Sequence, residues 1–206
     1  MTASEQFIQE IVREFPGFRL VPKRDSTLSK LIDFALRVVT FGGQREYMTH
    51  YHTVLGSTLY TPACWEGTAD VDRLITLRHE RVHLRQRRRL TFPVMAFVYM
   101  VPFFPVGLAY GRARLEWEAY EETLVATAEL RGLEALRSES LREHIVRRFT
   151  GPDYGWMWPF RSVVERWYDE AVRRIEQTKR TEETRRIKAP TPGSSDPSPP
   201  RGTGPG

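Results

Sequence analysis

The sequence is poor in cysteine, with Cys64 as the single thiol in 206 residues. One cysteine excludes an intramolecular disulfide framework and a zinc cluster built on cysteine. Lysine is also scarce, because 27 of the 31 basic residues are arginine, and only 78–89 holds a dense basic cluster. Since the other arginines are spread along the chain, the net charge of +5 does not by itself indicate a specific nucleic-acid partner.

Several common functional signatures are missing as well. The sequence has no glycine-rich phosphate loop, no GxSxG nucleophile elbow and no RNA-binding signature. Residues 1–7 do not show the basic start and apolar run of a secretory signal, so we expect a cytoplasmic location. A hydrophobic fraction of 40% and this chain length suit one folded domain, which we place over 1–178.

The hydrophobic patterning predicts an α+β fold that is mostly helical. A β-hairpin is expected over Tyr47–Pro62, with its turn at Gly56-Ser57, because polar and apolar residues alternate there. After 179 the chain becomes charged and then rich in proline, glycine and serine, which predicts a disordered tail over 179–206. Helices are expected over 4–14, 26–40, 70–89, 112–130, 139–149 and 161–177.

The third expected helix, which Thr68 or Asp70 can N-cap, carries the sequence His79-Glu-Arg-Val-His83, an HExxH motif. Residues four apart lie on one face of a helix, so both imidazoles can reach one metal ion, with Glu80 beside them. About one in a hundred chains of this composition would contain the motif by chance, so its context matters. The apolar residues around it fit a helix with one buried face.

A zinc site of this type needs a third protein ligand. Glu118 and Glu122 lie four residues apart in the next expected long helix and share a face with apolar residues. Glu116 and Glu121 are expected to point elsewhere, toward solvent. Glu118 and Glu122 are therefore the candidates for a buried third ligand.

HERVH followed by a helical Glu-Ala, with another acid four residues later, resembles the gluzincin metallopeptidases. The resemblance covers 47–130 and is closest to minimal single-domain members with a short β-hairpin beside the HExxH helix. It implies that His79, His83 and Glu118 bind Zn²⁺ and that Glu80 is the general base. It also implies that Glu122 orients one of the histidines.

The same resemblance implies hydrolysis of a peptide or protein that binds extended along the hairpin edge. Zinc would activate a water molecule, and a further donor would stabilise the oxyanion. The sequence does not decide which residue is that donor. The candidates are Tyr120, Tyr154, His144 and Arg112.

The segment 90–111 has no charged residue and is long enough to span a bilayer. A single crossing would separate Glu118 from His79 and destroy the proposed site. Three prolines also argue against one straight helix. We therefore favour a buried core segment or hydrophobic lid, with a membrane-contacting hairpin and a true span as alternatives.

The preferred interpretation is a zinc-dependent metallohydrolase. A metal-binding protein without turnover is one alternative, and a basic membrane-associated protein with an incidental HExxH is another. A second metal site of His50, His52 and His144 is a weaker alternative than ordinary polar residues on a half-exposed strand. The sequence leaves the oligomeric state open.

Overall fold

The computed structural model describes residues 1–27, 30, 52–90, 94, 108–151, 157–158 and 160–188. Its mostly helical architecture with a small sheet confirms the predicted α+β class. The helices are α1 (Ala3–Glu14), α3 (Asp70–Arg89), α5 (Leu108–Arg131), α6 (Glu139–Thr150) and α7 (Arg161–Lys188). The strands are β1 (Arg19–Pro22), β2 (Thr53–Leu55) and β3 (Thr58–Thr61), and the short 3-10 helices are η1 (Lys23–Asp25), η2 (Ala63–Gly67) and η3 (Leu133–Arg137).

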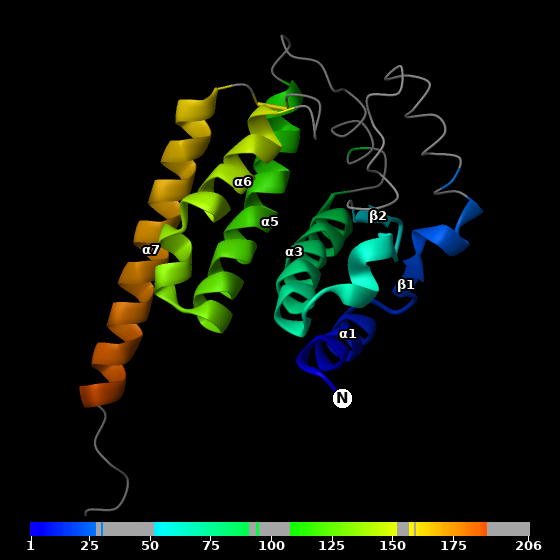
Figure 1. Ribbon diagram of the computed structural model, residues 1–206, viewed down its shortest axis with the longest axis horizontal. Coiled ribbons are helices and arrows are strands. Elements are labelled where there is room, and N and C mark those ends of the chain that lie inside the picture. Colours follow the sequence, from blue (N-terminus) through cyan, green and yellow to red (C-terminus); the bar gives the residue numbers. More distant parts are fainter. Residues whose placement is uncertain are drawn as a thin grey trace, which may run out of the picture.

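The helices α3 and α5 lie side by side at the centre of the described fold (Figure 1). On its other side α3 packs against α1, next to the small sheet. α5 packs on its other side against α7, which in turn packs against α6. Any side chains that α3 and α5 direct toward each other are therefore enclosed by helices on both sides.

The sheet has the order β1-β3-β2. β2 and β3 form the antiparallel hairpin predicted from the sequence, and Gly56 in its turn has φ +65°, a conformation that glycine adopts without strain. β1 adds in parallel to β3, with Leu20 opposite Leu59. The sequence did not reveal this pairing, because four residues are too few for a periodic pattern. Residues 47–51 of the predicted hairpin lie outside the described residues.

The helix α3 covers the predicted range, but its start is stabilised differently from our expectation. Ala69 occupies the N-cap position and makes no side-chain cap hydrogen bond. The Asp70 carboxylate instead accepts hydrogen bonds from the Ala3 backbone N–H, at 3.1 Å, and from the Ser4 hydroxyl. These bonds hold the pKa of Asp70 below its usual value. The first turn of α1 is thereby tied to the first turn of α3.

The arginines of α3 form ion pairs with neighbouring helices. The Arg85 Nε lies 2.6 Å from a Glu14 carboxylate oxygen in α1, and Arg81 faces the same carboxylate at 3.9 Å. On the other side, the Arg78 Nε lies 2.6 Å from Glu122 in α5. Three of the six arginines in the basic cluster at 78–89 are thus paired within the protein.

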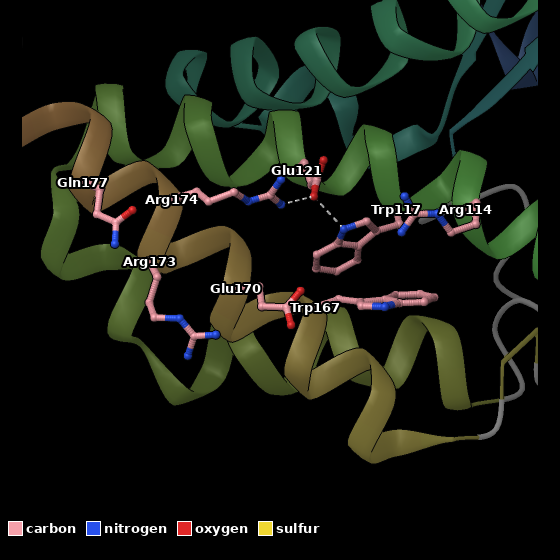
Figure 2. A pocket seen from close by; sticks show the side chains of 8 residues that line it. All are labelled: Arg114, Trp117, Glu121, Trp167, Glu170, Arg173, Arg174 and Gln177. Carbon is pink, nitrogen blue, oxygen red and sulfur yellow. Dashed lines mark hydrogen bonds and ion pairs between the residues drawn. The ribbon is translucent and has the colours of Figure 1, made fainter.

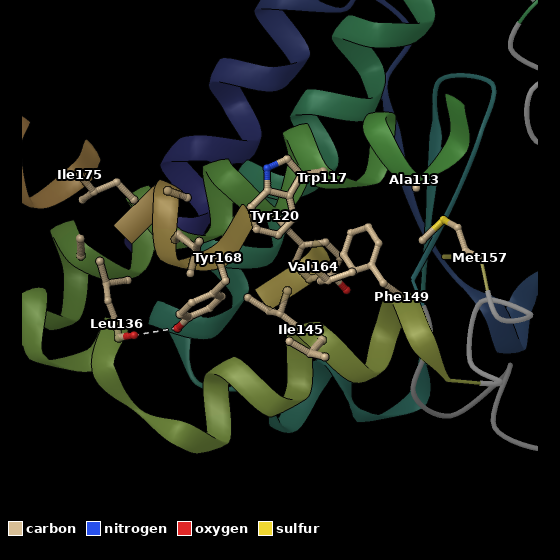
Figure 3. Close-up of a cluster of buried hydrophobic side chains, with 14 residues drawn as sticks. Ala113, Trp117, Tyr120, Leu136, Ile145, Phe149, Met157, Val164, Tyr168 and Ile175 are labelled. Carbon is tan, nitrogen blue, oxygen red and sulfur yellow. Dashed lines mark hydrogen bonds between the residues drawn. The ribbon is translucent and has the colours of Figure 1, made fainter. Parts of the chain in front are cut away.

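Two hydrophobic clusters lie on the two sides of the central helix pair. The cluster of α5, α6 and α7 includes Trp117 and Phe149, whose ring centroids are 5.9 Å apart (Figure 3). The other cluster joins α1, the sheet and α3 around Ile11, Leu59 and Leu77. One cluster thus packs α5 against α6 and α7, and the other packs α3 against α1 and the sheet.

Several boundaries differ from the predicted ones. α5 begins at Leu108, ahead of the predicted position. α7 continues to Lys188, so residues 179–188, which we assigned to the disordered tail, are helical. That stretch has Ile187 as its single apolar residue but lacks helix breakers, and its Thr181 hydroxyl donates to the Gln177 carbonyl one turn back, at 2.9 Å. The predicted tail beyond 188 lies outside the described residues.

The predicted helix over 26–40 and the apolar segment 90–111 fall largely outside the described residues. Whether 90–111 is core, lid or membrane-inserted therefore stays a prediction. Within the part of the chain that the structure describes, every helix is too short or too polar to cross a bilayer.

The Tyr168 hydroxyl donates a hydrogen bond of 2.7 Å to the Leu136 carbonyl in the α5–α6–α7 cluster (Figure 3). Tyr168→Phe leaves this buried carbonyl without its donor, so we expect the free energy of unfolding to fall by about 1–2 kcal/mol. Urea denaturation followed by circular dichroism measures the change. The exposed Tyr110→Phe is the matched control, and equal stabilities of the two variants would contradict the prediction.

Candidate metal centre

Three ligand atoms from His79, His83 and Glu116 lie within 4.8 Å of one another between α3 and α5. The two histidines are one helical turn apart on α3, and their Nε2 atoms are separated by 3.2 Å. The Nε2 of His83 lies 3.7 Å from a carboxylate oxygen of Glu116, which comes from α5. The HExxH helix and the following helix are thus brought together as the motif requires.

These separations fit a tetrahedral zinc ion. Two ring nitrogens that are each about 2.0–2.1 Å from such an ion would lie about 3.3 Å apart, close to the spacing of His79 and His83. A carboxylate oxygen completes a donor set of two imidazoles and one carboxylate, which leaves a fourth position open and is typical of catalytic zinc. The residues present therefore fit the metal that the motif predicts.

The site is buried, which constrains its charges. Glu116 is 4% exposed, and Glu80 and His83 are each 8% exposed. Tyr120, also buried, packs its ring on His79 with 4.9 Å between ring centroids. Buried ionisable groups are stable only when they are paired, neutralised or bound to a metal. A cation at the centre of this group would meet that requirement.

Burial raises the pKa of Glu80 to about 7, helped by the nearby charge of Glu116 and opposed by those of His83 and Lys23. Burial lowers the pKa of His79 well below its usual value, and His83 adds to the effect. At His83 burial also acts against the charged form, but Glu116 and Glu80 outweigh it and raise the pKa. Near neutral pH, Glu80 can therefore both accept and release a proton.

The third side chain differs from the one expected. Glu116, not Glu118, reaches the histidines, and Glu118 is exposed and bonded to Gln86 of α3 instead. The reason lies in the helical neighbours. Of the four residues one turn from Glu116 only Arg112 is charged, whereas three of the four around Glu118 are charged. This comparison was available in the sequence and would have favoured Glu116.

The other acids of this segment have separate partners. Glu122, for which we expected a contact with a histidine, forms its ion pair with Arg78. Glu121 accepts a hydrogen bond of 2.8 Å from the Trp117 indole N–H. Glu118 accepts one of 2.9 Å from the Gln86 amide. The carboxylates therefore point in several directions around α5, and only one of them faces the two histidines.

Of the candidates for the oxyanion donor, Tyr120 lies against His79. Arg112 is half-buried on α5 one turn before Glu116, and His144 is exposed on α6. Tyr154 lies outside the described residues. The choice among them stays a prediction, although Tyr120 is the one with a contact to a histidine of the site.

His52 lies closer to the site than its weak sequence signal suggested. Burial lowers the pKa of His52 to about 4, and its Nε2 atom is buried without a hydrogen-bond partner among the described residues. The ring packs edge-on against Trp65, at 5.2 Å between centroids. His52 does not join the three-residue group, and His50, its partner in the alternative metal site, lies outside the described residues.

A separate cavity of about 420 Å³ lies between α5 and α7, beside Trp117 and Trp167 (Figure 2). The Arg174 guanidinium crosses it to pair with Glu121. The triad lies on the α3 side of α5, so this cavity is not part of the metal centre. We assign the candidate function to the triad on chemical grounds, because its donor atoms converge.

Comparison with models of known protein families finds no match, and searches of curated proteins and of solved structures find no significant similarity. The arrangement of the triad is therefore the basis for any functional assignment. It establishes a buried group of two histidines and one glutamate, on an HExxH helix and its neighbour, that could hold a metal ion of unknown identity.

Glu116→Gln should abolish stoichiometric zinc binding, because it replaces the carboxylate at the centre by a neutral amide. Glu118→Gln is the matched control and should retain zinc with at most a modest loss of affinity. Metal analysis of the purified, dialysed proteins measures the difference. A zinc loss on Glu118→Gln that matches the loss on Glu116→Gln would contradict the assignment of the third ligand.

Proposed function

We propose that this protein is a zinc-dependent metallohydrolase that acts on a peptide or protein. The convergence of His79, His83 and Glu116 at distances suited to one zinc ion carries the proposal. Two imidazoles and one carboxylate favour zinc over magnesium or calcium, which prefer oxygen ligands. The resemblance of the HExxH motif and the following glutamate helix to gluzincins supports the peptidase assignment.

Zinc in such a site makes a coordinated water molecule acidic and polarises a substrate carbonyl. The protein must then supply a group that moves protons. Glu80 follows His79 directly, is buried beside His83 and Glu116, and has a pKa of about 7. We assign it the role of general base, which takes a proton from the attacking water and passes it to the leaving amine.

The hairpin beside α3 offers a way to bind an extended chain. Among the described strands β2 pairs only with β3, so its other edge retains backbone groups that a peptide could pair with. β2 also packs against α3, the helix that carries both histidines. A substrate strand added at this edge would run close to the metal centre.

Glu80→Gln should retain zinc but lose about 10²–10⁴-fold in hydrolytic rate, because the amide cannot accept the proton. The measurement is initial cleavage rates on a mixed fluorogenic peptide library, with zinc content determined on the same samples. Glu170→Gln, at an exposed position of α7, is the matched control and should leave the rate unchanged.

The outcomes separate the alternatives. An unchanged rate in Glu80→Gln would remove Glu80 as the base. A wild-type protein that holds zinc but cleaves no member of the library would favour the metal-binding alternative without turnover. Wild-type protein without near-stoichiometric zinc would overturn both the metallohydrolase proposal and the metal-binding alternative.

A further inference from the structure

Both histidines of the metal centre use Nδ1 for a hydrogen bond to a neighbouring side chain and direct Nε2 to the centre. The Nδ1 of His83 lies 3.0 Å from the Gln86 side-chain oxygen, and the Nδ1 of His79 lies 3.0 Å from the Thr123 hydroxyl. Which ring nitrogen carries the hydrogen decides whether Nε2 has a lone pair for a metal. The other hydrogen bonds of Gln86 and Thr123 determine which ring nitrogen carries the hydrogen.

The orientation of the Gln86 amide is fixed by its other contacts. Its nitrogen donates to the Leu115 carbonyl at 2.8 Å and to a Glu118 carboxylate oxygen at 2.9 Å. Both of these groups only accept, so a flipped amide would place its oxygen against two other oxygens. Gln86 is 2% exposed, so water does not readily replace these bonds. The amide oxygen must therefore face His83.

An amide oxygen only accepts hydrogen bonds, so the Nδ1 of His83 must carry the hydrogen. In the neutral ring this leaves the lone pair on Nε2, the atom that faces His79 and Glu116. The Thr123 hydroxyl acts in the same way on His79. It donates its single hydrogen to the Ala119 carbonyl, at 3.1 Å, and so accepts from the Nδ1 of His79.

We propose that Gln86 is a positioning residue that fixes the tautomer and ring orientation of His83 for metal binding, and that Glu118 anchors it. This inference rests on the metal centre of the proposed function but not on hydrolysis. Gln86 lies three residues after His83 on α3, while its two acceptors come from α5, so the amide joins both helices behind the ligand. Glu118 thereby acts on the site through Gln86 rather than as a ligand.

Gln86→Leu removes both the acceptor for Nδ1 and the link to α5. Loss of such a partner typically weakens metal binding about 10–100-fold, and we expect a loss in that range. Gln177→Leu on the exposed face of α7 is the control for the substitution itself and should bind zinc as the wild type does.

The experiment is a competitive zinc titration of the full chain against a chromophoric chelator, with thermal melts to check folding. In parallel, long-range ¹H–¹⁵N NMR of the metal-free wild type, at alkaline pH, reads the tautomer of His83 directly. We expect hydrogen on Nδ1 in the wild type and a mixture of tautomers in Gln86→Leu. These readouts do not depend on turnover.

Wild-type affinity in a folded Gln86→Leu variant would overturn the proposal, and so would hydrogen on Nε2 of His83 in the wild type. If Gln86→Leu does not fold, the NMR result on the wild type still decides the question, because an Nε2–H tautomer of His83 would count against the proposal. Absence of peptide cleavage would affect the proposed hydrolysis alone and leave this test intact.

Discussion

The structure depends on burying four ionisable side chains between two helices. His79, Glu80 and His83 from α3 and Glu116 from α5 occupy the seam where these helices pack. Such groups cannot remain in a low-dielectric interior without compensation. Hydrogen bonds to neighbouring side chains compensate part of the cost of burying these groups. A cation bound at the converging ligand atoms would compensate the remaining cost.

The supporting structure around the seam follows from this constraint. One hydrophobic cluster packs α5 against α6 and α7 and the other packs α3 against α1 and the sheet, while polar contacts join α3 to α5. Gln86 and Thr123 are bonded to the Nδ1 atoms of the two imidazoles, where water would otherwise compete for the hydrogen bond. The hydrophobic clusters therefore supply the free energy of packing, and the polar contacts between α3 and α5 orient the ligand atoms.

Much of this arrangement was visible in the sequence. The HExxH spacing identified α3 and the two histidines, because helical periodicity alone places residues four apart on one face. The Gly56 turn identified the hairpin in the same way. Glu116 was missed because the assignment of Glu118 followed the gluzincin resemblance and the apolar residues on the face that Glu118 shares with Glu122. The neighbours one turn away, which decide the burial of each position, carried the correct signal.

Other features were beyond local reasoning. The parallel pairing of β1 with β3 and the contact of Asp70 with α1 join segments that are distant in the chain, so no local periodicity records them. The orientation of Gln86 depends on two acceptors from another helix. In each case the determining information is the packing of α3 against its neighbours, which a single sequence does not contain.

The ion pairs along α3 have a consequence for how the two central helices align. Arg131 of α5 pairs with Asp72 near the start of α3, and Arg78 pairs with Glu122 in the middle. Partly exposed pairs of this kind add little to stability. A slip of one helix along the other by a single turn, about 5.4 Å, would nevertheless mismatch both pairs at once. The two ion pairs therefore favour the alignment of α3 and α5 in which the imidazoles meet the carboxylate. Because salt screens exposed charges, high salt should weaken this preference before it weakens the fold.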